Sequence, residues 1–318
     1  MSHEFGIAVL LLLVLVPLPI GLAGLINGWR TGSGSASPRP LTTDVAGAAS
    51  AAGWNWTLTF LSALLYVLAF NLTFFVQELF LVLPKAFTPG LEPTLFHNNH
   101  NWKGDHPLAS LFQGTGALAI FLSGLACALL VWRGVGRDSI ALRLFLIWMA
   151  FNGSFQALPQ VLAGAFIPGN DVGMAMDYLE LGATTRTVAA LIAVAAIPPL
   201  ALWLAHRILD LAADPAQVAS ARGRTACIFR LATVPALIAI PMIIAFRVPR
   251  ELLEVVLPPV LVTFVGVGWM QGCAWFLRRQ QATSGFRVTG TVSLAWPLGA
   301  MLMLLLVFQL VLRPGIPF

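Results

Sequence analysis

The sequence predicts an all-α, polytopic transmembrane helix bundle with about eight spans. Of its 318 residues, 58% are hydrophobic and only 10% are charged. A soluble domain carries about 25% charged residues. Apolar stretches recur that reach the roughly 18 residues needed to cross the hydrocarbon core of a bilayer. The alternation of apolar and polar residues that is typical of outer-membrane barrels is not seen, so helices in a lipid bilayer are expected.

Eight apolar segments are the predicted spans. They cover residues 6–27, 54–83, 109–132, 141–166, 183–205, 227–247, 253–276 and 291–312. The first has no basic segment before it, which favours a retained helix over a cleaved signal peptide. The linker at 28–53 is rich in Gly, Ser and Ala and is expected to be flexible. Residues 206–226 are expected to form a short interfacial stretch broken at Pro215.

Three regions are expected along the chain. Residues 1–53 hold the first span and its cytoplasmic linker. Residues 54–182 form a core bundle with two outer loops, at 84–108 and 167–182. Residues 183–318 form a C-terminal region of four transmembrane helices.

The distribution of lysine and arginine predicts the orientation. The loops after odd-numbered spans hold twelve of these residues, and the opposite side holds six. Positive side chains favour the cytoplasmic side, so both termini are predicted outward, in the periplasm, for a chain in a bacterial inner membrane. The arginines are scattered between spans rather than gathered in a patch, so no nucleic-acid partner is expected.

The outer loop at 84–108 concentrates imidazoles in the segment TLFHNNHNWKGDHP. His97, His100 and His106 follow the spacing H-x2-H-x5-H. If His97 and His100 share one helical turn, their rings face one way, and Asp171 could add an oxygen ligand. Such a set suits a divalent transition metal such as zinc, although imidazole also binds copper, iron or nickel. Two alternatives stay open: a hydrogen-bonded structural loop at the membrane interface, and a contact with a partner or substrate.

One ionisable residue, Glu78, lies inside the second predicted span. A carboxylate in a membrane helix is costly and indicates a functional role. Asn71, Glu78 and Lys85 are spaced by seven residues and therefore share one helix face. Glu78 is thus a candidate catalytic or relay carboxylate. The alternative is a structural carboxylate, bonded to a neighbouring helix or paired with Lys85.

The fourth predicted span carries a polar stripe. Asn152, Gln156 and Gln160 are spaced by four residues and fall on one helix face. An unpaired amide facing lipid costs several kcal/mol, so the stripe is expected to point into the bundle, toward Glu78 and Asn71. Hydrogen bonds between helices are the simpler interpretation of these amides.

Small residues line the third predicted span. They are Gly114, Gly116, Ala119, Ser123 and Gly124. Small side chains let helix backbones approach closely, which predicts tight packing of this span against its neighbours.

The order of motifs in the second to fourth spans resembles the site-2 protease family of membrane metallopeptidases, from residue 54 to about 175. QELFL (Gln77–Leu81) aligns with HExxH, GTGALA with a glycine-rich motif, and FNGSFQALPQVLAGAFIPGNDVG with an Asn, Leu-Pro and Asp-Gly motif. The resemblance implies Glu78 as general base and Asp171 as a zinc ligand. The sequence departs from the family where Gln77 and Leu81 replace the two histidines of HExxH. Val172 also separates Asp171 from Gly173.

Three functions stay open. The leading one is a non-catalytic, protease-like scaffold or accessory subunit of a membrane complex, because the HExxH histidines are absent; other membrane protein subunits are then the expected partners. The second is a metal-dependent membrane hydrolase that uses the His-rich outer loop. The third is a transporter that uses the polar stripe as its path.

Overall fold

Long apolar helices make up most of the chain. The computed structural model describes residues 54–167, 169–212, 218–249, 252–274 and 292–318, with a few isolated positions elsewhere. Within these ranges, seven helical segments are long and apolar enough to cross a membrane. They are Trp56–Ala86, Leu108–Trp132, Ile140–Phe166, Ala183–Leu209, Ala221–Arg247, Val255–Cys273 and Ala295–Leu312. The predicted all-α polytopic bundle is confirmed. The predicted span at 6–27 and the linker at 28–53 lie outside the described residues.

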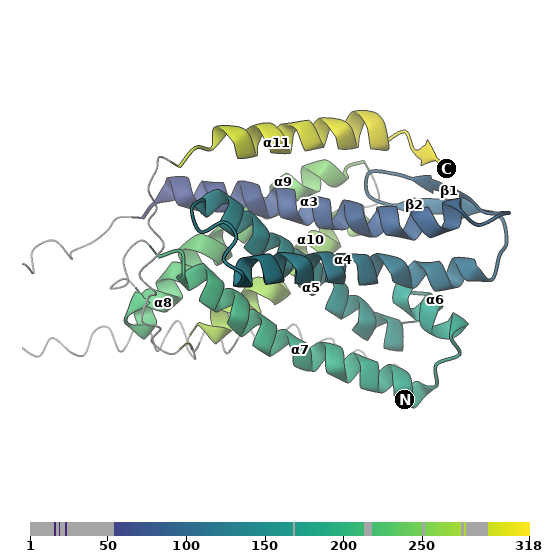
Figure 1. Ribbon diagram of the computed structural model, residues 1–318, viewed down its shortest axis with the longest axis horizontal. Coiled ribbons are helices and arrows are strands. Elements are labelled where there is room, and N and C mark those ends of the chain that lie inside the picture. Colours follow the sequence, from purple (N-terminus) through teal and green to yellow (C-terminus); the bar gives the residue numbers. More distant parts are fainter. Residues whose placement is uncertain are drawn as a thin grey trace, which may run out of the picture.

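The helices run side by side, and the short elements gather at the ends (Figure 1). In chain order, the elements are α3 (Trp56–Ala86), β1 (Glu92–Leu95), β2 (His100–Lys103), α4 (Leu108–Trp132), α5 (Ile140–Phe166), α6 (Asp171–Tyr178), α7 (Ala183–Leu209), α8 (Ala221–Ile228), η2 (Phe229–Thr233), α9 (Val234–Arg247), α10 (Leu252–Cys273), α11 (Ala295–Leu306), η3 (Val307–Leu312) and β3 (Ile316–Pro317). The strands and α6 lie at one end of the bundle, and α8 lies at the other (Figure 1).

Helices α3 and α5 occupy the interior of the bundle. In their most apolar 18-residue windows, 72% and 78% of the residues are buried, against 28% in α4 and 22% in the α11 segment. These two helices are the spans that carry Glu78 and the amide stripe. Since polar side chains are costly against lipid, the burial of α3 and α5 agrees with the inward orientation predicted for them.

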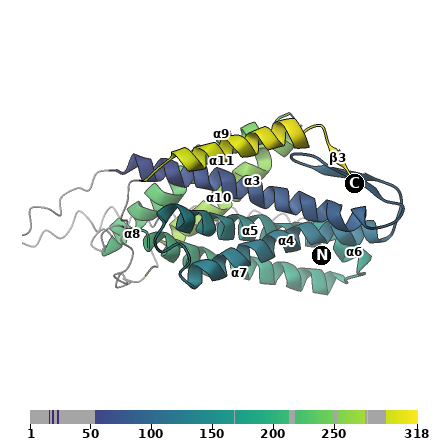
Figure 2. The ribbon, with the colours of Figure 1, turned by 45° about the horizontal axis from the view of Figure 1, so that its top comes forward.

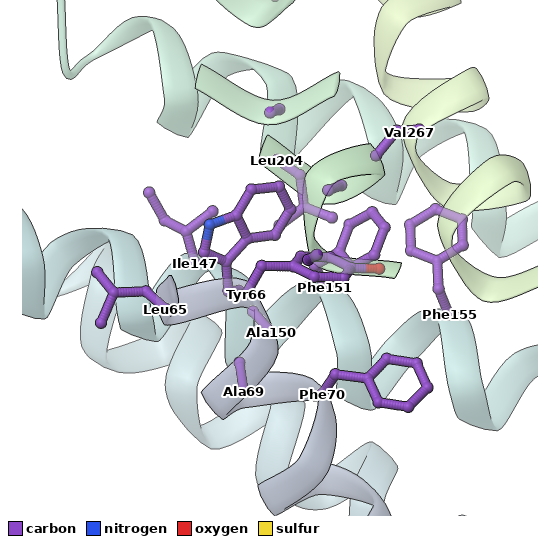
Figure 3. Packing of buried hydrophobic residues seen from close by; sticks show 14 of the residues in the cluster. Leu65, Tyr66, Ala69, Phe70, Ile147, Ala150, Phe151, Phe155, Leu204 and Val267 are labelled. Carbon is purple, nitrogen blue, oxygen red and sulfur yellow. The ribbon is translucent and has the colours of Figure 1, made fainter. Parts of the chain in front are cut away.

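An aromatic cluster forms the core between α3, α5 and α10 (Figure 3). The rings of Tyr66 and Trp148 meet edge to face, with centroids 4.7 Å apart, a favourable geometry for aromatic pairs. Their polar atoms are also paired. The Tyr66 hydroxyl lies 2.9 Å from the Thr263 hydroxyl, and the Trp148 indole N–H donates to the Ser62 hydroxyl at 3.0 Å. The core is therefore apolar in bulk and hydrogen-bonded at its few polar points.

Glycines set the distances between helices around α4. A Cβ atom on Gly153 of α5 would lie 2.5 Å from the carbonyl oxygen of Ile120 and 2.7 Å from the Cα atom of Gly124. A Cβ atom on Gly116 would lie 2.8 Å from the Leu81 side chain of α3. Helix α4 therefore approaches α5 and α3 as closely as its small residues allow, as the sequence predicts.

A β-hairpin closes one end of the bundle. Strands β1 and β2 pair antiparallel, with Leu95 opposite His100. The turn between them is closed by a bond from the Phe96 N–H to the Asn99 carbonyl, at 2.8 Å. The C-terminal strand β3 adds to the other edge of β1, giving the order β2-β1-β3, and it lies at the same end of the bundle (Figure 2). We call the hairpin, α6 and residues 313–318 the outer cap.

The close contact between α4 and α5 at Gly153 should be sensitive to a larger side chain. Gly153→Ala should lower the stability of the detergent-solubilised protein by about 1 to 3 kcal/mol, because overpacking against backbone cannot relax. The measurement is the shift of the thermal unfolding midpoint. Gly299→Ala in α11 is the matched control, since a Cβ atom there meets nothing within 4 Å. An equal loss in both variants would contradict the assigned role of Gly153.

Candidate functional site

A carboxylate from α3 and an imidazole from the outer cap meet at the centre of the site. The Glu78 Oε2 atom lies 2.8 Å from the His100 Nδ1 atom, and each side chain is only 6% exposed. Glu78 projects from the outer half of α3, and His100 begins strand β2, so the hairpin places the imidazole over the end of the helix. This contact links the membrane-spanning helix to the cap.

Both ring nitrogens of His100 have hydrogen-bond partners. The His100 Nε2 atom lies 3.1 Å from Gln113 Oε1, and the same oxygen lies 3.4 Å from Lys85 Nζ. A lysine ammonium only donates hydrogen bonds, so it keeps the amide oxygen of Gln113, an acceptor, turned toward His100. Nε2 must then donate, and Nδ1 faces a carboxylate. The two ring nitrogens of His100 therefore join Glu78 of α3 to Gln113 of α4.

Lys85 is fully buried beside this pair. Its ammonium donates to the Leu81 carbonyl at 2.8 Å and lies 4.6 Å from the centre of the Trp102 ring. The Trp102 ring also stacks on His100, with centroids 5.9 Å apart. A buried cation needs such compensation, because desolvation without partners costs several kcal/mol. Trp102 thus covers the Lys85 ammonium and the His100 ring from the side of the cap.

Asp171 brings a second carboxylate to the site. It is the first residue of α6, half-buried, and its charge interacts with Glu78, His100 and Lys85. Burial is the main cause that raises the pKa of Asp171, and the nearby Glu78 raises it further, whereas His100 and Lys85 lower it. Of the predicted site residues, Glu78 and His100 are in direct contact, and the charge of Asp171 interacts with both of them and with Lys85. We call the set Glu78, Lys85, His100, Gln113 and Asp171 the outer cluster.

The predicted amide stripe forms a hydrogen-bonded chain along α5. The amide of Asn152 donates to the Trp148 carbonyl at 3.0 Å, and that of Gln156 donates to Asn152 Oδ1 at 3.3 Å. Gln160 then donates to the Gln156 carbonyl at 3.0 Å and to Gln77 Oε1 at 2.9 Å. The stripe points into the bundle as predicted, and its contact with α3 is made through Gln77.

The α3 partners of the stripe differ from those expected. Asn71 donates within its own helix, to the Val67 carbonyl at 2.9 Å, and Glu78 bonds His100 of the cap. Gln77 and Glu78 are neighbours in sequence and lie about 100° apart around the helix, so they face different elements. The face of α3 that carries Gln77 turns to α5, while Glu78 turns to the cap.

The other two predicted histidine ligands have different surroundings. His97 lies buried in the turn of the hairpin, next to Asn98, whose side chain donates to the Arg247 carbonyl at 2.6 Å. His106 Nδ1 accepts a hydrogen bond from the Leu108 N–H at 3.2 Å and thereby caps the start of α4.

The side chains that could bind a metal ion are spread over the outer cap and α3. Among the described residues, no group of three His, Cys, Asp or Glu side chains is arranged to hold a metal ion. Both ring nitrogens of His100 are hydrogen-bonded, to Glu78 and Gln113. Zinc binding by His97, His100, His106 and Asp171 stays a prediction.

Three members of the site were not singled out as site residues by the sequence. Gln113 and Trp102 lacked a distinguishing pattern, because one amide and one indole near a span end are typical of membrane interfaces. The sequence indicates Lys85 as a residue on the same helix face as Glu78 and as its possible pairing partner. The signal for it was its position: a lysine seven residues beyond a buried carboxylate falls on the same helix face.

Comparison of the chain with protein-family models, curated proteins and solved structures finds no match.

Removing His100 should destabilise the cap. His100→Ala leaves the Glu78 carboxylate buried without its partner, and the loss of one member of a buried pair costs about 3 kcal/mol. We expect a lower unfolding midpoint and faster proteolysis of the hairpin in the detergent-solubilised protein. Asn101→Ala, one residue along the same strand and exposed, is the control and should behave like the wild type. Identical protease resistance of His100→Ala and wild type would show that this pair does not hold the cap.

Asp171 makes a pH-dependent prediction. Because its folded pKa is raised, the carboxylate destabilises the fold as it ionises, and stability falls as pH rises from its unfolded value near 4 through the folded value. Asp171→Asn should therefore unfold at a higher temperature than wild type at pH 7, with the difference shrinking toward pH 4. Glu180→Gln, an exposed carboxyl group just beyond α6, is the control. A destabilised Asp171→Asn at pH 7 would contradict the prediction.

Proposed function

We propose that this integral membrane protein is a non-catalytic scaffold or accessory subunit, whose outer cap is a rigid docking platform for another membrane protein. One observation carries the proposal: the buried polar groups of the outer cluster bond one another across α3, the hairpin and α4. Both nitrogens of His100 and the ammonium of Lys85 are engaged in these bonds. The cluster is built to hold elements together.

The exposed surface of the cap supports the same proposal. Glu92, Asn101, Lys103 and Asp105 face outward on or beside the hairpin, while the opposite face of the hairpin is fixed to α3 and α4. A platform of this kind is pre-organised, which reduces the entropy cost of binding a partner. Its exposed residues can change without disturbing the buried bonds beneath them.

The proposal is tested by stoichiometry. The full chain, tagged and purified in mild detergent from its own cells, should retain a membrane protein at a fixed molar ratio, measured by quantitative mass spectrometry. Crosslinks to that protein should map to the hairpin. Lys103→Ala combined with Asn101→Ala should weaken this association without changing the unfolding midpoint, whereas Arg222→Ala at the other end of the bundle should not. Purification as a lone chain, with no crosslinks to the cap, would sink the proposal.

A membrane hydrolase related to the site-2 proteases is the second candidate. One observation favours it: the charges of Glu78 and Asp171 interact, and these are the residues at which the resemblance implies base and ligand. This candidate predicts a near-stoichiometric metal in the purified protein and cleavage of a membrane-embedded peptide. Both should be lost in the combined variant His97→Ala and His100→Ala. Metal content that is negligible in wild type would leave the scaffold as the better description.

A further inference from the structure

A second cluster of charged residues lies at the end of the bundle opposite the outer cap. Arg137 is in the turn between α4 and α5, Arg143 is in the first turn of α5, and Arg207 is in the last turn of α7. Asp210 follows directly after α7, and its Oδ2 atom lies 2.9 Å from Arg207 Nη1. We call these four residues the inner cluster.

Arg143 is the fixed part of the inner cluster. It is only 4% exposed, and its Nη1 atom donates to the carbonyls of Val131, at 2.6 Å, and Val135, at 3.1 Å. These are carbonyls at and just beyond the end of α4, which carries the negative end of the helix dipole. The guanidinium is therefore a buried positive charge that cannot move away from the junction of α4 and α5.

A single carboxylate is shared among the three arginines. Burial is the main cause that raises the pKa of Asp210, and Arg207, Arg143, His206 and Arg137 each lower it, so all three arginines act on this one carboxyl group. Three guanidinium groups, always charged at neutral pH, face one carboxylate. The inner cluster therefore holds an excess of two positive charges, besides any charge on His206.

Part of the inner cluster is exposed at the surface of the protein. The side chains of Arg207 and Asp210 are 23% and 24% exposed, and Arg137 is exposed. The Arg207 guanidinium lies 5.9 Å from the centre of the Trp203 ring, and Trp132 is exposed at the end of α4. Tryptophans concentrate where the headgroups meet the hydrocarbon, so we expect Arg137 and Arg207 to lie within reach of lipid headgroups, with Arg143 buried behind them.

We propose that Arg137, Arg143 and Arg207 form a binding site for the phosphate group of an anionic lipid. A guanidinium matches a phosphate with two parallel hydrogen bonds, and basic pockets between transmembrane helices bind such headgroups. The Nε atoms of Arg143 and Arg207 are buried and have no hydrogen-bond partner among the described residues, so each guanidinium has a donor that an anion drawn into the cluster would satisfy. An anion would also offset the excess positive charge.

Lipid binding by the full chain is the test. Native mass spectrometry of the protein in detergent, titrated with phosphatidylglycerol or phosphatidylcholine, should show saturable binding of the anionic lipid only. Arg207→Gln and Arg137→Gln should each weaken it about fivefold, the effect of one arginine near an anionic surface. Arg222→Gln removes the same charge from exposed α8 and should change the affinity little. An equal loss of affinity in Arg222→Gln would show that the lipid is held by general charge attraction, and would overturn the proposed site.

Asp210→Asn supplies a test of opposite sign. Removing the competing carboxylate should tighten phosphatidylglycerol binding about fivefold, an effect that simple damage to the fold would not produce. An unchanged or weaker affinity in a folded Asp210→Asn protein would overturn the proposal. Inorganic phosphate is the second probe. Displacement of the lipid by phosphate at concentrations as low as those of the lipid itself would assign the site to free phosphate and also overturn the proposal.

Discussion

A carboxylate buried in an apolar bundle must find a hydrogen-bond donor, and Glu78 finds it in His100. The hairpin must therefore sit over the outer end of α3, because only there does β2 place the ring against Glu78. Once His100 is fixed, its second nitrogen requires an acceptor, which Gln113 of α4 supplies. Gly116 makes that possible by letting α4 approach α3 closely. The position of the cap thus follows from satisfying one buried acid.

Local periodicity explains how much of this arrangement the sequence predicts. Composition and length predict the spans, and helical spacing predicts that Glu78 and the stripe of Asn152, Gln156 and Gln160 face inward. Spacing within one helix does not define the rotation of that helix relative to its neighbours. Gln77 and Glu78 are adjacent, so a rotation of about 100° decides which of them meets α5. The pairing of Gln160 with Gln77 therefore emerges only from the packed bundle.

In the outer cap, the spacing of residues in the sequence predicts even less of the structure. Reading His97 and His100 as one helical turn assumes a local geometry, whereas the segment pairs as strands of four residues each. Its central strand is completed by Ile316 and Pro317, more than two hundred residues away along the chain. Such a non-local pairing leaves no periodic trace in so short a segment. The histidines consequently divide into a turn residue, the first residue of an edge strand and a helix cap.

The two charged clusters differ in their balance of positive and negative side chains. In the outer cluster, the two acidic residues Glu78 and Asp171 lie with the two basic residues His100 and Lys85, and the bonds of Glu78, His100, Lys85 and Gln113 join elements of the same chain. In the inner cluster, three arginines share Asp210, and the positive excess is open toward the interface. A balanced buried network needs no outside partner and serves to hold structure, whereas an unbalanced one lowers its energy by binding an anion. Charge balance therefore distinguishes the end of the bundle that is built to be rigid from the end that is built to bind.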